Sequence, residues 1–342
     1  MVCVDNQVSS CLPVLHGVPQ GSIIGPLLFI LFINDLPLHL GSTDVSVDLY
    51  ADDTTLISSS DFNSINKLKN SLQSSLVDVE DWATSNKLPL NESKTKSLLV
   101  AGKRLKNRLE DNDKQLNLKT AKGYFLEQVS FAKLLGLEID DDLSFKVHID
   151  KLCSKLSRRI GVLNKIKSCL PLKQRLTYYN AVIKPVMSYA SVLWMESNKE
   201  YLTKILRLQK RAARVILDAP PQASSVELFN RLKWIPFYEE AKISKAVLAY
   251  KRLHHLVPQY FMDVLKLNSD FHGRTSRYSS INLMCPLYKR KTEGGRTFSV
   301  TCSQLWNCID LKTRKLGTTT TFRNTLRKQT LENQKNLNHF KV

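Results

Sequence analysis

The sequence predicts an α+β protein whose N-terminal part is an antiparallel sheet backed by helices and whose remainder is all-helical. Two patterns support this fold class. Around residues 45–57, apolar residues alternate with polar ones on both sides of Tyr50-Ala51-Asp52-Asp53, which is typical of a β-hairpin. Over 61–83, 149–166 and 201–217, apolar residues recur at spacings of three and four, which is typical of amphipathic helices.

The first predicted helix begins near Gly25-Pro26 and ends near Ile33. Pro26 suits the first turn of a helix. The apolar run Ile23–Ile33 is too short to cross a bilayer, and no basic residue precedes it as in a secretory signal. We therefore expect a buried helix and no membrane partner.

The helix predicted over 61–83 has one apolar face, and Asp61 stands near its start as a cap. We expect Trp82 to pack in the core at the end of this helix and 97–100 to return to the sheet as a strand. Residues 102–122 carry seven lysines and arginines with little periodicity, which indicates an exposed loop.

Alternation over 129–135 predicts another strand, and the two long helices with basic outer faces follow it. Cations clustered on helix faces are the expected footprint of phosphate binding, although each one singly fits a plain surface cation. Pro220-Pro221 marks a linker, and apolar stripes typical of helices resume after it. We assign no chemical role to the tail.

Composition narrows the class of protein. The chain has 342 residues, 43% of them hydrophobic, which argues against wholesale disorder. It carries 50 Lys and Arg against 31 Asp and Glu, and no Lys or Arg precedes Lys67. An acidic start and a basic remainder suit a metal site followed by a phosphate-binding body, and the alternative is a generally basic protein.

Seven cysteines are scattered without any Cys-x-x-Cys pair. This pattern indicates reduced thiols in a protein of the nucleus or cytoplasm that is not secreted. We expect no disulfide-linked partner.

Asp52 and Asp53 stand side by side at the predicted turn, where their charges repel one another. A divalent cation is a common reason to hold such a pair, because its charge reverses the local electrostatics. Mg²⁺ takes one or two carboxylates, and waters and phosphates fill its other positions. The alternative for an isolated Asp-Asp pair is a solvated turn.

A glycine-rich loop, Gly17-Val18-Pro19-Gln20-Gly21-Ser22, precedes the first helix. Its glycines allow backbone conformations and close approaches that side chains would block. A loop that exposes amides and the Gln20 side chain beside a buried helix is a plausible floor for a nucleotide and its template base. Taken alone, such a loop is also ordinary structure.

Taken together, these segments point to one protein family more specifically than any one of them does alone. The Gly17 loop with Gly25-Pro26, Asn34-Asp35-Leu36-Pro37 and Tyr50-Ala51-Asp52-Asp53 occur in the order and at the spacing of a known family. They resemble the reverse transcriptase of a non-LTR (LINE-like) retrotransposon. The resemblance continues through Trp82, Asn86, Asn91 and Lys94, through Phe131–Leu137, and through Leu208-Gln209-Lys210-Arg211-Ala212, and it is looser after residue 215.

The resemblance implies an RNA-directed DNA polymerase, a nucleotidyltransferase whose partners are an RNA template, a DNA primer and deoxynucleotide triphosphates. It implies two Mg²⁺ ions, which Mn²⁺ can replace, held by the catalytic residues Asp52 and Asp53. Lys94 is the implied proton donor to pyrophosphate. The implied roles of the others are nucleotide and template binding for Gln20, Gly21, Tyr50 and Ala51, the primer grip for Leu135 and Gly136, and backbone contacts for Arg158, Arg159, Arg207, Lys210, Arg211 and Arg214.

The implied domains are a partial palm over 1–145, a thumb-like helical region over 146–218 and a C-terminal helical region of unknown role over 226–342. The family's fingers and first catalytic aspartate precede the Gly17 loop, and we recognise neither in residues 1–16. We therefore expect the chain to be inactive by itself. The alternative function is that of a catalytically inactive, nucleic-acid-binding remnant.

Overall fold

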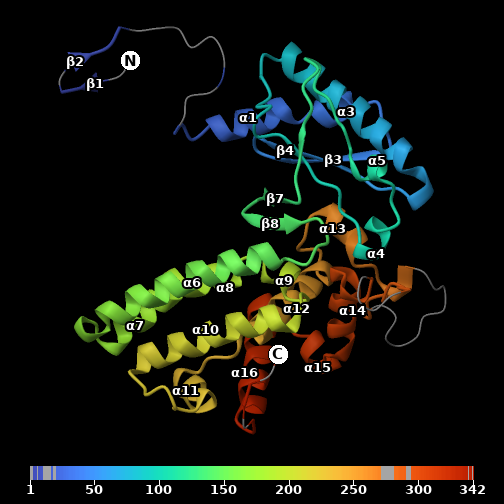
Figure 1. The fold of residues 1–342 in the computed structure, drawn as a ribbon. Coiled ribbons are helices and arrows are strands. Elements are labelled where there is room, and N and C mark those ends of the chain that lie inside the picture. The colour runs from blue at the N-terminus through green and yellow to red at the C-terminus, as the bar shows by residue number, and fades with distance from the viewer. Residues whose placement is uncertain are drawn as a thin grey trace. The chain divides into compact units, whose positions relative to one another are not determined.

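The computed structural model describes residues 3–5, 7–10, 17, 21–270, 281–289, 294–337, 339–340 and 342. The chain forms two compact units, Met1–Ala132 and Lys133–Val342. Both are shown in Figure 1, where helices predominate and each sheet has two strands. This mixture confirms the predicted α+β class.

The first unit holds three of the four two-stranded pairings. Its elements are β1 (Cys3–Val4), β2 (Gln7–Val8), α1 (Gly25–Ile33), α2 (Leu36–His39), β3 (Val45–Tyr50), β4 (Asp53–Ser58), η1 (Phe62–Ser64), α3 (Ile65–Ser85), β5 (Lys96–Ser97), α4 (Lys103–Lys106), α5 (Asp111–Lys114) and β6 (Glu127–Gln128). Strand β7 (Phe131–Leu134) begins at its end.

The second unit is helical apart from the β7–β8 pair. Its elements are β8 (Leu137–Asp140), α6 (Lys146–Ile166), η2 (Lys167–Cys169), α7 (Leu172–Tyr178), η3 (Tyr179–Ile183), α8 (Lys184–Ser188), α9 (Ser191–Trp194), α10 (Lys199–Leu217), α11 (Ser225–Leu232), α12 (Phe237–Leu253), α13 (Gln259–Val264), η4 (Asn268–Asp270), η5 (Gly294–Arg296), α14 (Phe298–Cys308), α15 (Leu311–Arg314) and α16 (Thr319–Gln334).

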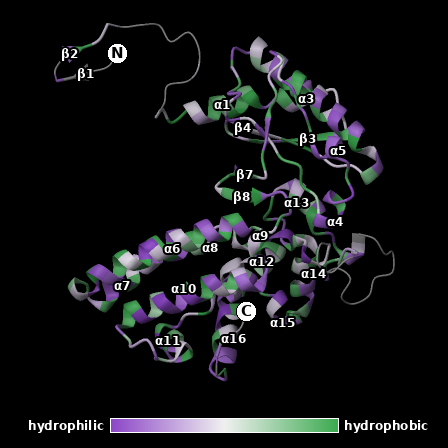
Figure 2. Ribbon diagram, viewed as in Figure 1, coloured by the Kyte–Doolittle hydropathy of each residue, from purple (hydrophilic) through white to green (hydrophobic). Residues whose placement is uncertain are grey.

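Helix α1 starts with Pro26 in its first turn, as the sequence predicts. It is apolar along its length (Figure 2). Ile33 is buried in a core cluster, but Leu27 and Leu31 are 59% and 65% exposed. The expectation of a buried helix is therefore wrong for the described residues, because they pack against only one side of α1.

Helix α3 confirms the amphipathic helix predicted over 61–83, although it begins at Ile65 after the 3₁₀ turn η1. Asp61 occupies the N-cap of that turn without a capping hydrogen bond from its side chain. Trp82 is 5% exposed, and its indole N–H donates to Asp35 Oδ1 at 3.1 Å. Core packing of Trp82 is thus confirmed.

The prediction of an exposed loop over 102–122 is wrong in part. Leu109, Leu116 and Leu118 are buried, and the last two pack with Leu76 of α3. Leu116 and Leu118 are two residues apart, as on one face of a strand, but this alternation is too short to predict burial next to so many charged residues.

Helices α6 and α10 lie side by side in the second unit (Figure 1). Their predicted apolar stripes are confirmed. The stripe residues exposed by 6% or less are Ile149, Leu152, Leu156, Ile160, Leu163, Leu202, Ile205, Ala212 and Ile216. Ile166, predicted to end the first stripe, is an exception at 37% exposed. Burying one such side chain contributes roughly 1.5–3 kcal/mol, so this interface stabilises the unit strongly.

A second core cluster lies farther along the same unit, where α12, α14 and α16 pack around Tyr250, Trp306 and Phe322. The predicted domain boundaries, after residues 145 and 218, stay predictions. The division between the two compact units instead falls between Ala132 and Lys133.

Among the described helices, none combines the length and the apolar character needed to span a membrane. The described cysteines Cys153, Cys169, Cys285, Cys302 and Cys308 are free thiols. Cys302 is buried, and burial raises the pKa of its thiol to about 12, so this side chain stays protonated.

Candidate functional site

Strands β3 and β4 form an antiparallel hairpin with a two-residue turn. Tyr50 pairs with Asp53 at the last rung, so Ala51 and Asp52 make the turn. Alternation turns Leu49 toward the core and leaves Tyr50 and Asp53 on the exposed face. The predicted hairpin with two adjacent exposed carboxylates at its tip is therefore present.

Ala51 has a φ of +52°, which residues other than glycine seldom adopt. The left-handed conformation costs an alanine about 1–2 kcal/mol relative to a right-handed one. Strain of this kind is found at functional sites, where the surrounding structure holds it. Here it closes the turn in two residues and places Asp52 beyond the last pair of the ladder.

The glycine loop is described only in part. Gly17 and Gly21 have φ values of +80° and +83°, which strongly favour glycine at both positions. Ser22 Oγ accepts a hydrogen bond from the Gly25 N–H at 3.0 Å at the start of α1. Gln20 lies outside the described residues, so its role stays a prediction.

Lys94 lies in the turn between α3 and β5, not in the hairpin. Its backbone N–H donates to Asn91 Oδ1 at 3.2 Å, and its side chain is exposed. The structure thus brings Tyr50, Ala51, Asp52 and Asp53 into one hairpin and leaves Lys94 on a separate turn.

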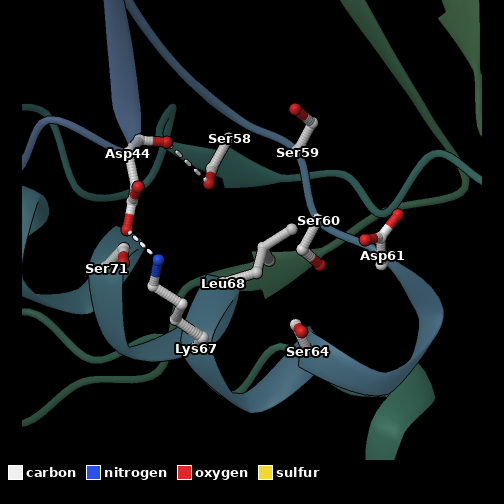
Figure 3. Close-up of a pocket in the computed structure, with 9 residues that line it drawn as sticks. All are labelled: Asp44, Ser58, Ser59, Ser60, Asp61, Ser64, Lys67, Leu68 and Ser71. Atoms are coloured by element: carbon white, nitrogen blue, oxygen red, sulfur yellow. Dashed lines mark hydrogen bonds and ion pairs between the residues drawn. The ribbon is translucent and has the colours of Figure 1, made fainter.

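A pocket of about 190 Å³ lies at the opposite end of the hairpin, where β3 starts and β4 ends (Figure 3). Ser58, Asp61 and Lys67 are among its lining residues. Lys67 Nζ pairs with Asp44 Oδ2 at 2.8 Å across it. Because the carboxylates of Asp52 and Asp53 are at the other end, this pocket is not the predicted nucleotide site.

Leu135 and Gly136 form the turn between β7 and β8, with φ values of +46° and +85°. The Tyr189 hydroxyl donates to the Leu135 carbonyl at 2.5 Å. A Cβ on Gly136 would lie 3.5 Å from the Tyr189 ring. Tyr189 therefore fixes the turn predicted to be the primer grip, a contact that the sequence pattern did not reveal.

We expect Gly136→Ala to lower the free energy of unfolding by about 1 kcal/mol, because its positive φ disfavours alanine. Gly161→Ala is the matched control. Gly161 lies inside α6 with open space around it, so the same change should stabilise by roughly 0.5–1 kcal/mol. Denaturant unfolding followed by tryptophan fluorescence measures both, since three of the four tryptophans lie in the second unit. Equal effects of the two changes would contradict the strained turn.

Helix α10 gathers its predicted nucleic-acid contacts on one face. Arg207, Lys210, Arg211 and Arg214 follow one another at spacings of three, one and three, opposite the buried stripe. Arg207 and Arg211 are exposed, and Lys210 and Arg214 are half-buried. Burial, and then the charges of Arg214 and Arg207, lower the pKa of Lys210, so these cations repel one another.

The two predicted arginines of α6 differ. Arg158 is exposed, whereas the half-buried Arg159 donates to the Val182 carbonyl in the π-helical turn η3. Arg159 therefore has an internal structural partner, which a phosphate would have to share.

Residues 2–139 match the family described as reverse transcriptase (RNA-dependent DNA polymerase). The matched range includes the Gly17 loop and the Tyr50–Asp53 hairpin. A probable RNA-directed DNA polymerase from transposon BS of Drosophila melanogaster is 30% identical over 268 residues, 75% of this chain and 28% of that protein. The chain is related to the reverse transcriptases of non-LTR retrotransposons. The resemblance predicted from the sequence is confirmed.

Two other retrotransposon polymerases are also similar to the chain. The RNA-directed DNA polymerase from mobile element jockey of Drosophila melanogaster is 28% identical over 64% of this chain and 24% of its own length. A Pol polyprotein from retrotransposable element R1 of Nasonia vitripennis is 25% identical over 68% of each chain. The chain therefore spans about a quarter of the BS and jockey polymerases. No solved structure matches it.

The reverse transcriptase family implies use of a divalent metal, and the hairpin tip offers ligands of the right kind. The carboxylates of Asp52 and Asp53 are exposed hard oxygen donors, and Mg²⁺ binds with one or two carboxylates plus substrate phosphates. Among the described residues, no three His, Cys, Asp or Glu side chains gather as a ready metal site. The two aspartates would therefore supply some, but not all, of the ligands that such an ion needs.

Proposed function

We propose that this reverse transcriptase relative carries part of the active site of an RNA-directed DNA polymerase. The single observation that carries the proposal is the hairpin with two exposed carboxylates at its tip, within the segment that matches the family. The substrates would be deoxynucleotide triphosphates and a DNA primer paired with an RNA template. Copying such a template would take place inside the cell, in the nucleus, the cytoplasm or both.

Asp52 and Asp53 would hold two Mg²⁺ ions, or Mn²⁺ in their place, together with a carboxylate from outside the hairpin. The metals would supply charge that favours attack by the primer 3′-hydroxyl on the α-phosphate and departure of pyrophosphate. Ala51 closes the turn that carries the aspartates, and Gln20, Gly21, Tyr50 and Ala51 would bear on the nucleotide and template. Lys94 would donate a proton to pyrophosphate if template and nucleotide bring it near the tip.

Within the second unit, the helical region over 146–218 would act as the thumb that holds the template–primer duplex. In this proposal the Leu135–Gly136 turn, fixed by Tyr189, positions the primer end. Arg158 and the basic face of α10 contact phosphates, and Arg159 contributes chiefly by supporting η3.

The binding part of the proposal is tested with the chain alone on a labelled RNA–DNA hybrid, by fluorescence anisotropy across a salt series. We expect affinity to fall steeply with salt, because each bound phosphate releases counterions. Changing Arg207, Lys210, Arg211 and Arg214 together to Gln should flatten the slope of log affinity against log salt. The change in slope should reach up to about 0.9 for each phosphate that the variant no longer neutralises.

The matched control changes four exposed cations outside α10, namely Arg231, Lys312, Arg323 and Lys328, to Gln. Both variants lose the same charge, and circular dichroism checks that both fold. If the two variants bind with the same affinity and slope, the basic face of α10 is not the interface.

A further inference from the structure

A groove of about 310 Å³ lies in the second unit, between the C-terminal end of α6 and the C-terminal half of α10. Its volume is at the small end of the range for ligand pockets, roughly 300–1,000 Å³. Val215, Ala219 and Pro221 supply apolar lining. The polar lining residues are Asn164, Lys167, Arg211 and Arg214.

Three cations thus line one small groove. Lys167 Nζ pairs with Asp218 Oδ1 at 2.5 Å, which leaves two guanidinium groups without a carboxylate partner among the described contacts. Arg211 Nη1 donates to the Ser157 hydroxyl, at 3.3 Å. The groove therefore carries a net positive charge.

The guanidinium of Arg214 is only partly hydrogen-bonded to its neighbours. Its Nε is buried from solvent and has no hydrogen-bond partner among the described residues. Its Nη2 donates to the Ala223 carbonyl at a long 3.5 Å. Because Nε is shielded from solvent, a ligand in the groove would be bonded by the terminal Nη atoms of Arg214, and the long bond to Ala223 leaves them capacity to do so.

We propose that this groove binds a phosphate group, supplied by the backbone of the bound nucleic acid. Guanidinium groups present planar pairs of donors that match phosphate oxygens, and Asn164 and Lys167 add single donors at the wall. The apolar lining suits the sugar attached to the phosphate. The assignment of the source rests on the proposed function, whereas the phosphate chemistry of the groove does not.

The phosphate chemistry is tested by thermal unfolding of the full chain in inorganic phosphate against chloride at equal ionic strength. Ligand that binds only the folded state raises the unfolding temperature, so phosphate should stabilise the wild-type protein more than chloride does. The double variant Lys167→Gln with Arg211→Gln should lose this difference. The control double variant, Lys155→Gln with Lys199→Gln, takes one exposed cation from each helix outside the groove and should keep it.

Arg214→Lys gives a test that preserves charge. Lysine keeps the cation but lacks the planar fork, so the phosphate-specific stabilisation should fall even though the net charge is unchanged. Full retention of that stabilisation in both Arg214→Lys and the groove double variant would overturn the proposed site.

The source of the phosphate is tested by anisotropy with a labelled RNA–DNA hybrid. We expect the groove double variant to lose at least threefold more affinity than the control double variant, and inorganic phosphate to compete with the hybrid. Equal losses in the two double variants would overturn the backbone assignment. If wild-type protein shows the phosphate effect but binds no hybrid, the groove takes free phosphate and the proposed polymerase interface fails separately.

Discussion

Asp52→Asn is expected to slow primer extension by roughly a thousandfold, the largest effect we anticipate for any single change. Loss of a metal ligand removes several kcal/mol of transition-state stabilisation, and about 4 kcal/mol corresponds to a thousandfold in rate. Template affinity should change little, because the carboxylate at the hairpin tip contributes no attraction to phosphate. The measurement is incorporation of deoxynucleotides on an RNA template with Mg²⁺ or Mn²⁺.

This rate is measured in a chimera that joins the chain to the upstream segment of the BS polymerase, the relative that is 30% identical. The matched control is Asp48→Asn, which removes the same charge from the same hairpin but pairs with Thr55 away from the tip. We expect near-parental extension from the control and none from the 342-residue chain alone. Equal rates for Asp52→Asn and the parent would remove Asp52 from the metal site, and robust extension by the chain alone would refute its expected inactivity.

Glu196→Ala is expected to destabilise the second unit by about 3 kcal/mol, because it leaves a buried ammonium without its counter-charge. Lys245 on α12 is 1% exposed, and its Nζ lies 2.7 Å from Glu196 Oε1 and 2.8 Å from Thr301 Oγ1 of α14. Lysine buried this deeply depends on such partners. Denaturant unfolding followed by tryptophan fluorescence measures the loss.

A second change distinguishes the ion pair from packing. Adding Lys245→Met to Glu196→Ala should recover most of the stability, since an apolar chain of similar length then fills the site without a charge. Glu239→Ala serves as the control on α12, because its partner Lys242 is 43% exposed, against 1% for Lys245, and pairs at the surface contribute at most about 1 kcal/mol. If Glu196→Ala costs no more than this control, Lys245 is not held by the pair.

Much of the local structure could be predicted because its signal lies in neighbouring residues. The alternation on either side of Tyr50–Asp53 predicted the hairpin and its tip, and the apolar stripes of α6 and α10 predicted their buried faces. The exposure of α1 could not be predicted in this way. A helix apolar on all sides indicates burial on all sides, but the described residues cover only one of them.

Sequence by itself determined the family, the helical and hairpin segments, and the residues proposed for the metal and the nucleic acid. Only the tertiary structure decided which of these residues already contact other residues of the protein. It placed Arg159 on the Val182 carbonyl, the Tyr189 hydroxyl on the Leu135 turn, and Lys167 beside Arg211 and Arg214 around one groove. The physical reason is distance along the chain. Periodicity reports which face of an element is apolar, whereas a polar contact between distant residues depends on how those faces pack.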